Sequence, residues 1–250
     1  MPRRARKKAE SGVYHVMLRG IDRQMIFEDS EDSLQFLHII QKNMQVCNFK
    51  LYAYCLMGNH VHLLIRDPND ELENIFKRIA GSYVYYFNAK YQRVGHLFQD
   101  RFKSEPVEDD AYFLTVLRYI HQNPVKGNLC KKMEEYPYSS YTEYIRESKL
   151  ADTEFALGMV GLDEFIRFHN TPNDDICLEA TQPVRRAVTD AQARLVISKI
   201  ARCDSVAEFQ KLEAKKKEQY IKKIHKQGVS IRQLSKLTGT SKGIIEKYLK

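Results

Sequence analysis

The sequence predicts an α+β protein in which an antiparallel sheet with helices on one face is followed by an all-α helix-turn-helix module. In the first half of the chain, short stretches rich in strand-forming residues alternate with longer stretches of helical periodicity. From about residue 189 the pattern is helical. The 250 residues are 43% hydrophobic, which suffices for a packed core and excludes a disordered or collagen-like chain.

The expected elements of the first half are strand, helix, strand, strand, helix, strand and helix. The first strand ends at Gly20, and Asp29 or Ser30 caps the first helix. A Gly58-Asn59 turn joins the next two strands into a hairpin. The remaining bounds are 13–19 and 49–57 for the first two strands, 60–66 for the third, about 71–91 for the second helix, 102–107 for the last strand and 111 to about 123 for the last helix.

This order is the split βαβ pattern of a ferredoxin-like sheet, extended by one helix. Pro106 favours an edge position for the fourth strand, because proline cannot donate to a neighbouring strand. Pro124 disfavours helical geometry at Asn123, so the last helix is expected to end there.

We expect three parts: an α+β domain over residues 1–150, a linker with short helices over 151–188, and a helix-turn-helix DNA-binding domain over 189–250. In the last part, Ser230 and Ser241 can cap two short helices separated by a turn at Gly239. Their inward-facing residues are expected to be Ile231, Leu234 and Leu237, then Ile244, Ile245 and Tyr248. A small helical bundle that serves protein contacts is the alternative.

The charge of the chain indicates what kind of partner the protein binds. The net charge is +8, with 40 Lys and Arg against 32 Asp and Glu, and residues 203–250 alone hold 12 basic against 5 acidic residues. Five of the first eight residues are basic, so a nucleic acid is favoured over a merely solvated surface.

The five cysteines are scattered and expected to be reduced. No apolar run reaches the roughly 18 residues of a membrane span, and no signal peptide is visible, so we expect a cytoplasmic protein.

His60 and His62 form the most specific local feature. Side chains two apart on a strand point to the same face, so these imidazoles project side by side and suit one divalent metal ion. A His-x-His pair also occurs in strands by chance. Magnesium or manganese fits phosphate chemistry, although two imidazoles would also accept zinc.

Tyr119 and Asn123 lie four residues apart, and hence on one helix face, off the centre of the apolar stripe. A tyrosine oxygen can attack a DNA phosphate and store the bond energy as a phosphotyrosine. A metal ion beside it would neutralise the developing charge. In a chain with 15 tyrosines, an ordinary residue at the core margin is the alternative. Gln122 and His121 compete with Asn123 as a third metal ligand.

Four blocks of sequence, at residues 58–64, 95–104, 118–125 and 136–141, resemble the successive motifs of the IS200-like single-tyrosine transposases. More closely they resemble the REP-associated tyrosine transposases, which are HUH endonucleases. The resemblance spans residues 13–145 in order and spacing. One departure is Tyr138, which stands where the family commonly has Trp.

The resemblance implies that His60 and His62 are the HUH metal ligands, Tyr119 the nucleophile and Asn123 the third ligand. It implies cleavage of single-stranded DNA beside a hairpin, with Mg²⁺ or Mn²⁺, leaving a 5′-phosphotyrosine and a free 3′-hydroxyl, as in DNA transposition. Related enzymes work as homodimers or as monomers, and both stay open. A non-catalytic DNA-binding regulator and a nuclease that hydrolyses DNA with water are the competing functions.

Residues 189–250 also resemble the duplex-binding domain of the replication initiator DnaA, with a recognition helix at about 240–250. Duplex DNA is therefore expected as a second partner. The DNA-binding candidates in the N-terminal arm are Arg3, Arg4, Arg6, Lys7 and Lys8. Those elsewhere are Arg101, Lys103, Thr240, Ser241, Lys242 and Lys247.

Overall fold

The computed structural model describes residues 6–178, 190–203 and 205–249 of the chain. The chain divides into two compact units, residues 1–181 and 182–250, and each is described by itself. Arg3 and Arg4, which we expect to contact DNA, lie outside the described residues, as does the second half of the expected linker from residue 179 on.

The first unit is built on a four-stranded antiparallel sheet of β1 (Val13–Arg19), β2 (Lys50–Met57), β3 (His60–Arg66) and β4 (Lys103–Pro106). The strand order is β2-β3-β1-β4, so β1 lies between β3 and β4. This order confirms the ferredoxin-like sheet, the hairpin of β2 and β3, and the edge position of β4.

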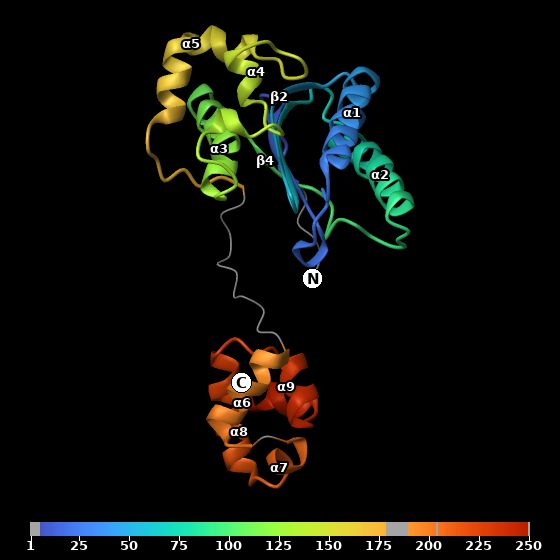
Figure 1. The fold of residues 1–250 in the computed structure, drawn as a ribbon, viewed down its shortest axis with the longest axis vertical. Coiled ribbons are helices and arrows are strands. Elements are labelled where there is room, and N and C mark those ends of the chain that lie inside the picture. The colour runs from blue at the N-terminus through green and yellow to red at the C-terminus, as the bar shows by residue number, and fades with distance from the viewer. Residues whose placement is uncertain (1–5, 179–189, 204, 250) are drawn as a thin grey trace. The chain divides into compact units, whose positions relative to one another are not determined.

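One face of the sheet is covered by α1 (Ser30–Cys47) and α2 (Leu72–Lys90), as Figure 1 shows. Their apolar stripes pack on strand side chains that alternate toward this face, including Val16, Leu18, Val61 and Leu63. This is the face on which both helices of the split βαβ pattern are expected.

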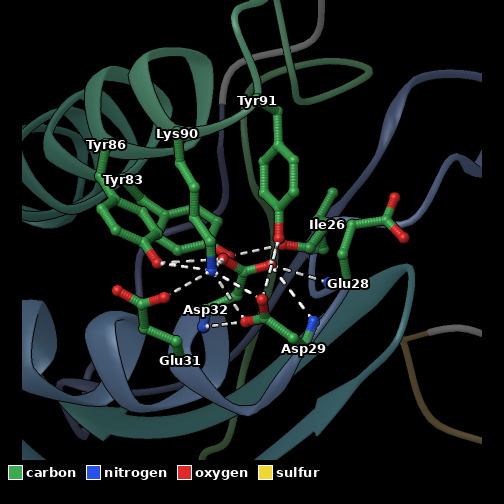
Figure 2. Close-up of polar contacts among 9 residues, drawn as sticks. All are labelled: Ile26, Glu28, Asp29, Glu31, Asp32, Tyr83, Tyr86, Lys90 and Tyr91. Carbon is green, nitrogen blue, oxygen red and sulfur yellow. Dashed lines mark hydrogen bonds and ion pairs between the residues drawn. The ribbon is translucent and has the colours of Figure 1, made fainter.

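Figure 2 shows a polar network that joins the start of α1 to the end of α2. Asp29 caps α1, accepting a hydrogen bond from the Asp32 backbone at 3.0 Å. The Asp32 carboxylate is fully buried and also accepts from the Tyr91 hydroxyl at 2.8 Å. Lys90 completes the network through ion pairs of 2.8 to 2.9 Å with three carboxylates, those of Asp29, Glu31 and Asp32.

The opposite face is covered by α3 (Asp110–Lys126), so the expectation of helices on one face only is wrong for this helix. Alternate residues of β2 and β3, such as Cys55 and Leu64, are apolar on this side as well and pack against Phe113, Val116 and Ile120. A sheet that is apolar on both faces must be covered on both.

The predicted end of α3 at Asn123 is also wrong, because the helix continues through Pro124 to Lys126. Proline removes the backbone N–H that would donate to the Ile120 carbonyl, so the helix continues with one hydrogen bond fewer. Pro124 is buried, and the Gly127 N–H closes the helix on the Asn123 carbonyl at 2.8 Å.

Much of the expected linker of residues 151–188 is a helix, α5 (Glu154–Asn170), which packs against α3 and the short α4 (Tyr141–Ile145). The buried His121 and His169 rings join α3 to α5 through a 3.0 Å hydrogen bond. Residues 154–170 therefore belong to the first unit.

The second unit contains α6 (Asp190–Ala201), α7 (Val206–Gln210), α8 (Ala214–Lys226), α9 (Ile231–Thr238) and α10 (Lys242–Leu249). Ser230 caps α9, and Gly239 takes a left-handed φ of 71°, as its turn requires. Leu234, Leu237 and Ile245 are buried as expected, whereas Ile244 is 46% exposed. Within the described parts of both units, no helix has the length and apolarity needed to cross a membrane.

Candidate active site

The two histidines of β3 lie on the face of the sheet that α3 covers. Val61 and Leu63 alternate with them and pack under α1 and α2. Both imidazoles are buried, His60 at 8% and His62 at 0% exposure, and their ring centroids are 5.1 Å apart. The strand alternation therefore places the two rings side by side.

Tyr119 reaches this pair from α3. Its ring centroid lies 5.7 Å from that of His62, nearly perpendicular to it, and the side chain is 7% exposed. The Lys126 ammonium lies 5.6 Å from the Tyr119 ring centroid, about two helical turns nearer the end of α3, and is exposed. The tyrosine, the histidines and a solvent-accessible cation thus meet at one place.

A third histidine, His15 of β1, belongs to the same cluster, and the sequence analysis does not single it out. His15 Nε2 lies 2.9 Å from His62 Nδ1, and its ring centroid is 5.9 Å from that of Tyr119. His15 Nδ1 lies 2.9 Å from Oε1 of Glu105, on β4. The signal that could find His15 is the ferredoxin-like order itself, which places β1 between β3 and β4.

The hydrogen bonds of His60 decide which of its ring nitrogens can bind a metal. Asn59 Nδ2 donates to the Arg23 carbonyl at 3.3 Å, so the Asn59 carbonyl oxygen faces the imidazole. His60 Nδ1 lies 2.6 Å from that oxygen and therefore donates to it. The lone pair of neutral His60 is then on Nε2, as a metal ligand requires.

A neutral histidine pair fits a divalent ion when oxygen atoms complete the site. Across residues 6–178, 190–203 and 205–249, no group of three or more His, Cys, Asp or Glu side chains is placed to hold a metal ion. A third protein ligand would therefore be another kind of group, such as an amide oxygen.

The three candidates for that ligand point in different directions. Asn123 is buried on the Tyr119 stripe of α3, and its Nδ2 donates to the Tyr119 carbonyl at 3.3 Å, which leaves Oδ1 as the ligand atom. Gln122 Nε2 donates to the His169 carbonyl at 2.6 Å and its Oε1 accepts from Asn173 at 2.9 Å. His121 bonds to His169 and, at 2.9 Å, to Ser140. Both competitors are therefore directed toward α5 and α4.

The carboxylate of Glu105 is the acidic group that borders the cluster. Burial by itself raises the pKa of Glu105, but hydrogen bonds, chiefly the one from His15, lower this pKa overall. The same carboxylate accepts from the Leu178 backbone N–H at 3.1 Å. Glu105 is therefore an ionised acceptor.

The basic residues of the N-terminal arm differ in their surroundings. Arg6 forms a 2.7 Å ion pair with Asp70 and lies over the Tyr14 ring, and Lys8 also pairs with Asp70. Hydrogen bonds from Lys8 and Arg6 lower the pKa of Asp70 to about 2. Lys7 is exposed. Arg6 and Lys8 thus fasten the arm to the domain.

The DNA-binding candidates outside the N-terminal arm have exposed side chains, with the exception of Thr240. Arg101 lies 3.8 Å from Glu73 with 63% of its side chain exposed, and Lys103 is exposed on β4. In the second unit, Ser241, Lys242 and Lys247 are exposed at and along α10. Thr240 is 6% exposed and its hydroxyl accepts from Gln210 at 3.3 Å, so it is turned inward, and its contact with DNA stays a prediction.

The fold and the site together define a class: a ferredoxin-like domain that presents two strand histidines to a tyrosine on a covering helix. Residues 8–123 match the family described as "Transposase IS200 like". Over these residues the chain is therefore similar to the IS200-like transposases.

One named protein and one solved structure are also similar to this chain. The chain is 32% identical over 105 residues to a protein of Haemophilus influenzae named as a REP-associated tyrosine transposase, covering 37% of this chain and 59% of that relative. A solved structure of a REP-associated tyrosine transposase bound to a REP hairpin is 18% identical and superposes with a TM-score of 0.54. That likeness covers 74% of this chain and 99% of the solved one, and it concerns the fold.

Proposed function

We propose that this protein is a single-tyrosine transposase that cleaves and rejoins single-stranded DNA beside hairpins through a covalent 5′-phosphotyrosine. The observation that carries the proposal is the Tyr119 ring, held 5.7 Å from that of His62 on the two-histidine face of the sheet. Support for transposase activity on DNA comes from the match of residues 8–123 to the IS200-like family, from the similar Haemophilus influenzae protein and from the shared fold of the hairpin-bound transposase.

In the proposed cleavage, Tyr119 Oη attacks the scissile phosphorus. A tyrosine–phosphate bond forms at the 5′ side while the bond from phosphorus to the 3′-oxygen breaks. Tyr119 loses its phenolic proton, and the departing 3′-oxygen takes up a proton to become a hydroxyl. Rejoining is the same exchange in reverse with a 3′-hydroxyl as nucleophile, so no bond energy is lost.

The residues that would hold Mg²⁺ or Mn²⁺ are His60 and His62 through Nε2, with Asn123 through Oδ1. The bound ion would supply Lewis-acid neutralisation of charge on the phosphate. Among the chain's own groups, the Lys126 ammonium beside the Tyr119 ring adds a fixed positive charge for the same phosphate.

A covalent-adduct assay tests the nucleophile. Wild-type protein incubated with Mn²⁺ and hairpin-bearing single-stranded oligonucleotides should yield a protein–DNA adduct that survives denaturing electrophoresis. Tyr119→Phe should abolish it, because the phenyl ring keeps the packing and lacks the attacking oxygen. Tyr85→Phe is the matched control, since Tyr85 is 81% exposed on α2.

The same assay separates the competing functions. An adduct undiminished in Tyr119→Phe would overturn the nucleophile assignment. Cleavage with free 5′-phosphate ends and no adduct would indicate a nuclease that uses water. Absence of cleavage by wild type, with hairpin binding intact, would indicate a non-catalytic regulator, whereas cleavage that is lost in His60→Ala would exclude it.

We further propose that residues 189–250 bind duplex DNA as a helix-turn-helix module. Support comes from the Ser230 cap, the left-handed Gly239 turn and the exposed Lys242 and Lys247 of α10. Duplex affinity of the full chain should fall in Lys242→Ala with Lys247→Ala, while hairpin cleavage persists. Unchanged duplex binding would favour a bundle that serves protein contacts.

A further inference from the structure

We infer that Glu105 and His15 are positioning residues that fix the tautomer of His62, so that its Nε2 lone pair faces the metal site. This inference rests on the proposed function, because it concerns the same site. His15 lies on β1 and Glu105 on β4, so both residues lie outside the two-histidine motif of β3.

The geometry is a continuous chain of hydrogen bonds across three neighbouring strands. Glu105 Oε1 lies 2.9 Å from His15 Nδ1, and His15 Nε2 lies 2.9 Å from His62 Nδ1. The register aligns them, because His15 of β1 pairs with Glu105 of β4 and lies two residues before Met17, which pairs with His62. The His15 and His62 rings are both fully buried.

The hydrogen bonds along this chain determine which ring nitrogen of each histidine carries the proton. An ionised carboxylate can only accept, so His15 Nδ1 carries the proton shared with Glu105. A neutral imidazole has one donor and one acceptor, so His15 Nε2 accepts from His62 Nδ1. The lone pair of His62 is consequently on Nε2, the arrangement of carboxylate–histidine–metal chains.

Two comparisons within the molecule support a role in positioning. His60 reaches the same protonation pattern through a different acceptor, the Asn59 carbonyl oxygen, so both strand histidines present Nε2. The buried pair His121 and His169 ends instead at the Phe165 carbonyl and the Ser140 hydroxyl. That pair has no carboxylate partner and joins two helices.

The lowered pKa of Glu105 agrees with its ionised state, and its hydrogen bond from the Leu178 backbone holds the carboxylate in place. Glu105 is partly exposed, with 24% of its side chain accessible, so its replacement should leave the fold intact.

The first test is ¹⁵N NMR of the histidine rings in the metal-free full-length protein, with His62 assigned by the His62→Gln spectrum. Wild type should show His62 as the Nδ1–H tautomer. Glu105→Ala should convert a substantial fraction to the Nε2–H tautomer, because His15 is then free to donate from Nε2. Glu105→Gln, whose amide oxygen can accept the same bond, should keep the wild-type tautomer.

The second test is Mn²⁺ affinity, measured by electron paramagnetic resonance without DNA. Glu105→Ala should weaken Mn²⁺ binding by about 10- to 100-fold, the range typical of residues that orient a ligand. Glu164→Ala, which removes a carboxylate from an exposed ion pair on α5, should have no effect.

An unchanged His62 tautomer in Glu105→Ala would overturn the inference, as would wild-type Mn²⁺ affinity in that variant. Neither the tautomer measurement nor the Mn²⁺ affinity depends on DNA cleavage. A protein with the expected tautomer shift but no DNA adduct would instead contradict the proposed function and leave the positioning chain standing.

Discussion

The two faces of the sheet place their polar groups differently. On the face under α1 and α2, the strand side chains are apolar and the polar network lies at the helix ends, where Lys90 meets three carboxylates (Figure 2). On the face under α3, the polar groups lie within the sheet itself, as His15, His60 and His62.

The difference shows which polar groups stabilise the fold and which serve chemistry. Carboxylates at a helix N-terminus accept hydrogen bonds from free backbone N–H groups and interact favourably with the positive end of the helix dipole. They therefore stabilise the helix that they cap. A histidine in the middle of a sheet face displaces an apolar side chain and needs a hydrogen-bonding partner to offset its burial. We therefore expect variants of the two faces to separate stability from activity.

The largest effect on stability should come from Asp32→Ala on the first face. This change removes a fully buried carboxylate that bonds to Lys90, Tyr91 and the Glu28 backbone. The free energy of unfolding, measured by urea denaturation, should fall by roughly 3 kcal/mol, as when one partner of a buried ion pair is removed. DNA cleavage per folded molecule should be unchanged.

Glu31→Ala is the matched control, since the Glu31 carboxylate pairs with the same ammonium but is 71% exposed. Its cost should be below about 1 kcal/mol. Equal losses in the two variants would contradict the importance of burial, and a specific loss of cleavage in Asp32→Ala would break the separation between the faces.

Local patterns in the sequence predict the strands well. The structure confirms 13–19 and 60–66 as β1 and β3, because alternation and a Gly58-Asn59 turn depend only on neighbouring residues. The same alternation suffices to bring His60 and His62 to one face. Helical periodicity likewise gives α2 within one residue at each end, 72–90 against 71–91.

What depends on distant parts of the chain is harder to predict. Periodicity shows that α3 has an apolar stripe, but it does not say which sheet face the stripe covers. The role of His15 requires the pairing of β1 with both β3 and β4. Residues 151–188 lack clear periodicity, so a linker with short helices is expected there, whereas the structure has α5, which Gly161 interrupts with a φ of 72°.

An intermediate effect on stability should come from a change of pH. It acts through the buried pair of His121 and His169, which joins α3 to α5. Burial, the larger cause, and the nearby Arg118 charge lower the pKa of His169 to about 3, from an ordinary value of 6.5. Between these values the unfolded chain binds a proton that the folded chain excludes, so stability is lost as pH falls below about 6.5. From pH 7 to 5 the loss should be roughly 2 kcal/mol for this group.

Urea denaturation at both pH values measures this loss, and His169→Gln isolates it. Glutamine keeps a hydrogen-bonding side chain but does not titrate, so the variant should be less sensitive to pH than wild type even if it is less stable at pH 7. An identical pH dependence in the two proteins would show that other groups cause the acid sensitivity.

The smallest effect should distinguish the two edges of the sheet. Lys103 is exposed on β4 and shares its strand face with Glu105, beside the histidine cluster. Lys50 is exposed on the opposite edge strand, β2, where it pairs with Asp152 at 2.8 Å. If single-stranded DNA passes the β4 edge on its way to Tyr119, only Lys103 neutralises a phosphate.

Lys103→Ala should then weaken hairpin DNA binding about 3- to 10-fold and lower the salt dependence of the logarithm of the binding constant by about 0.7, the value for one phosphate of a single strand. Lys50→Ala should change neither quantity. Fluorescence anisotropy over a series of salt concentrations measures both. Equal effects of the two variants would mean that the DNA senses only net charge, and a larger effect of Lys50→Ala would place the strand at the β2 edge.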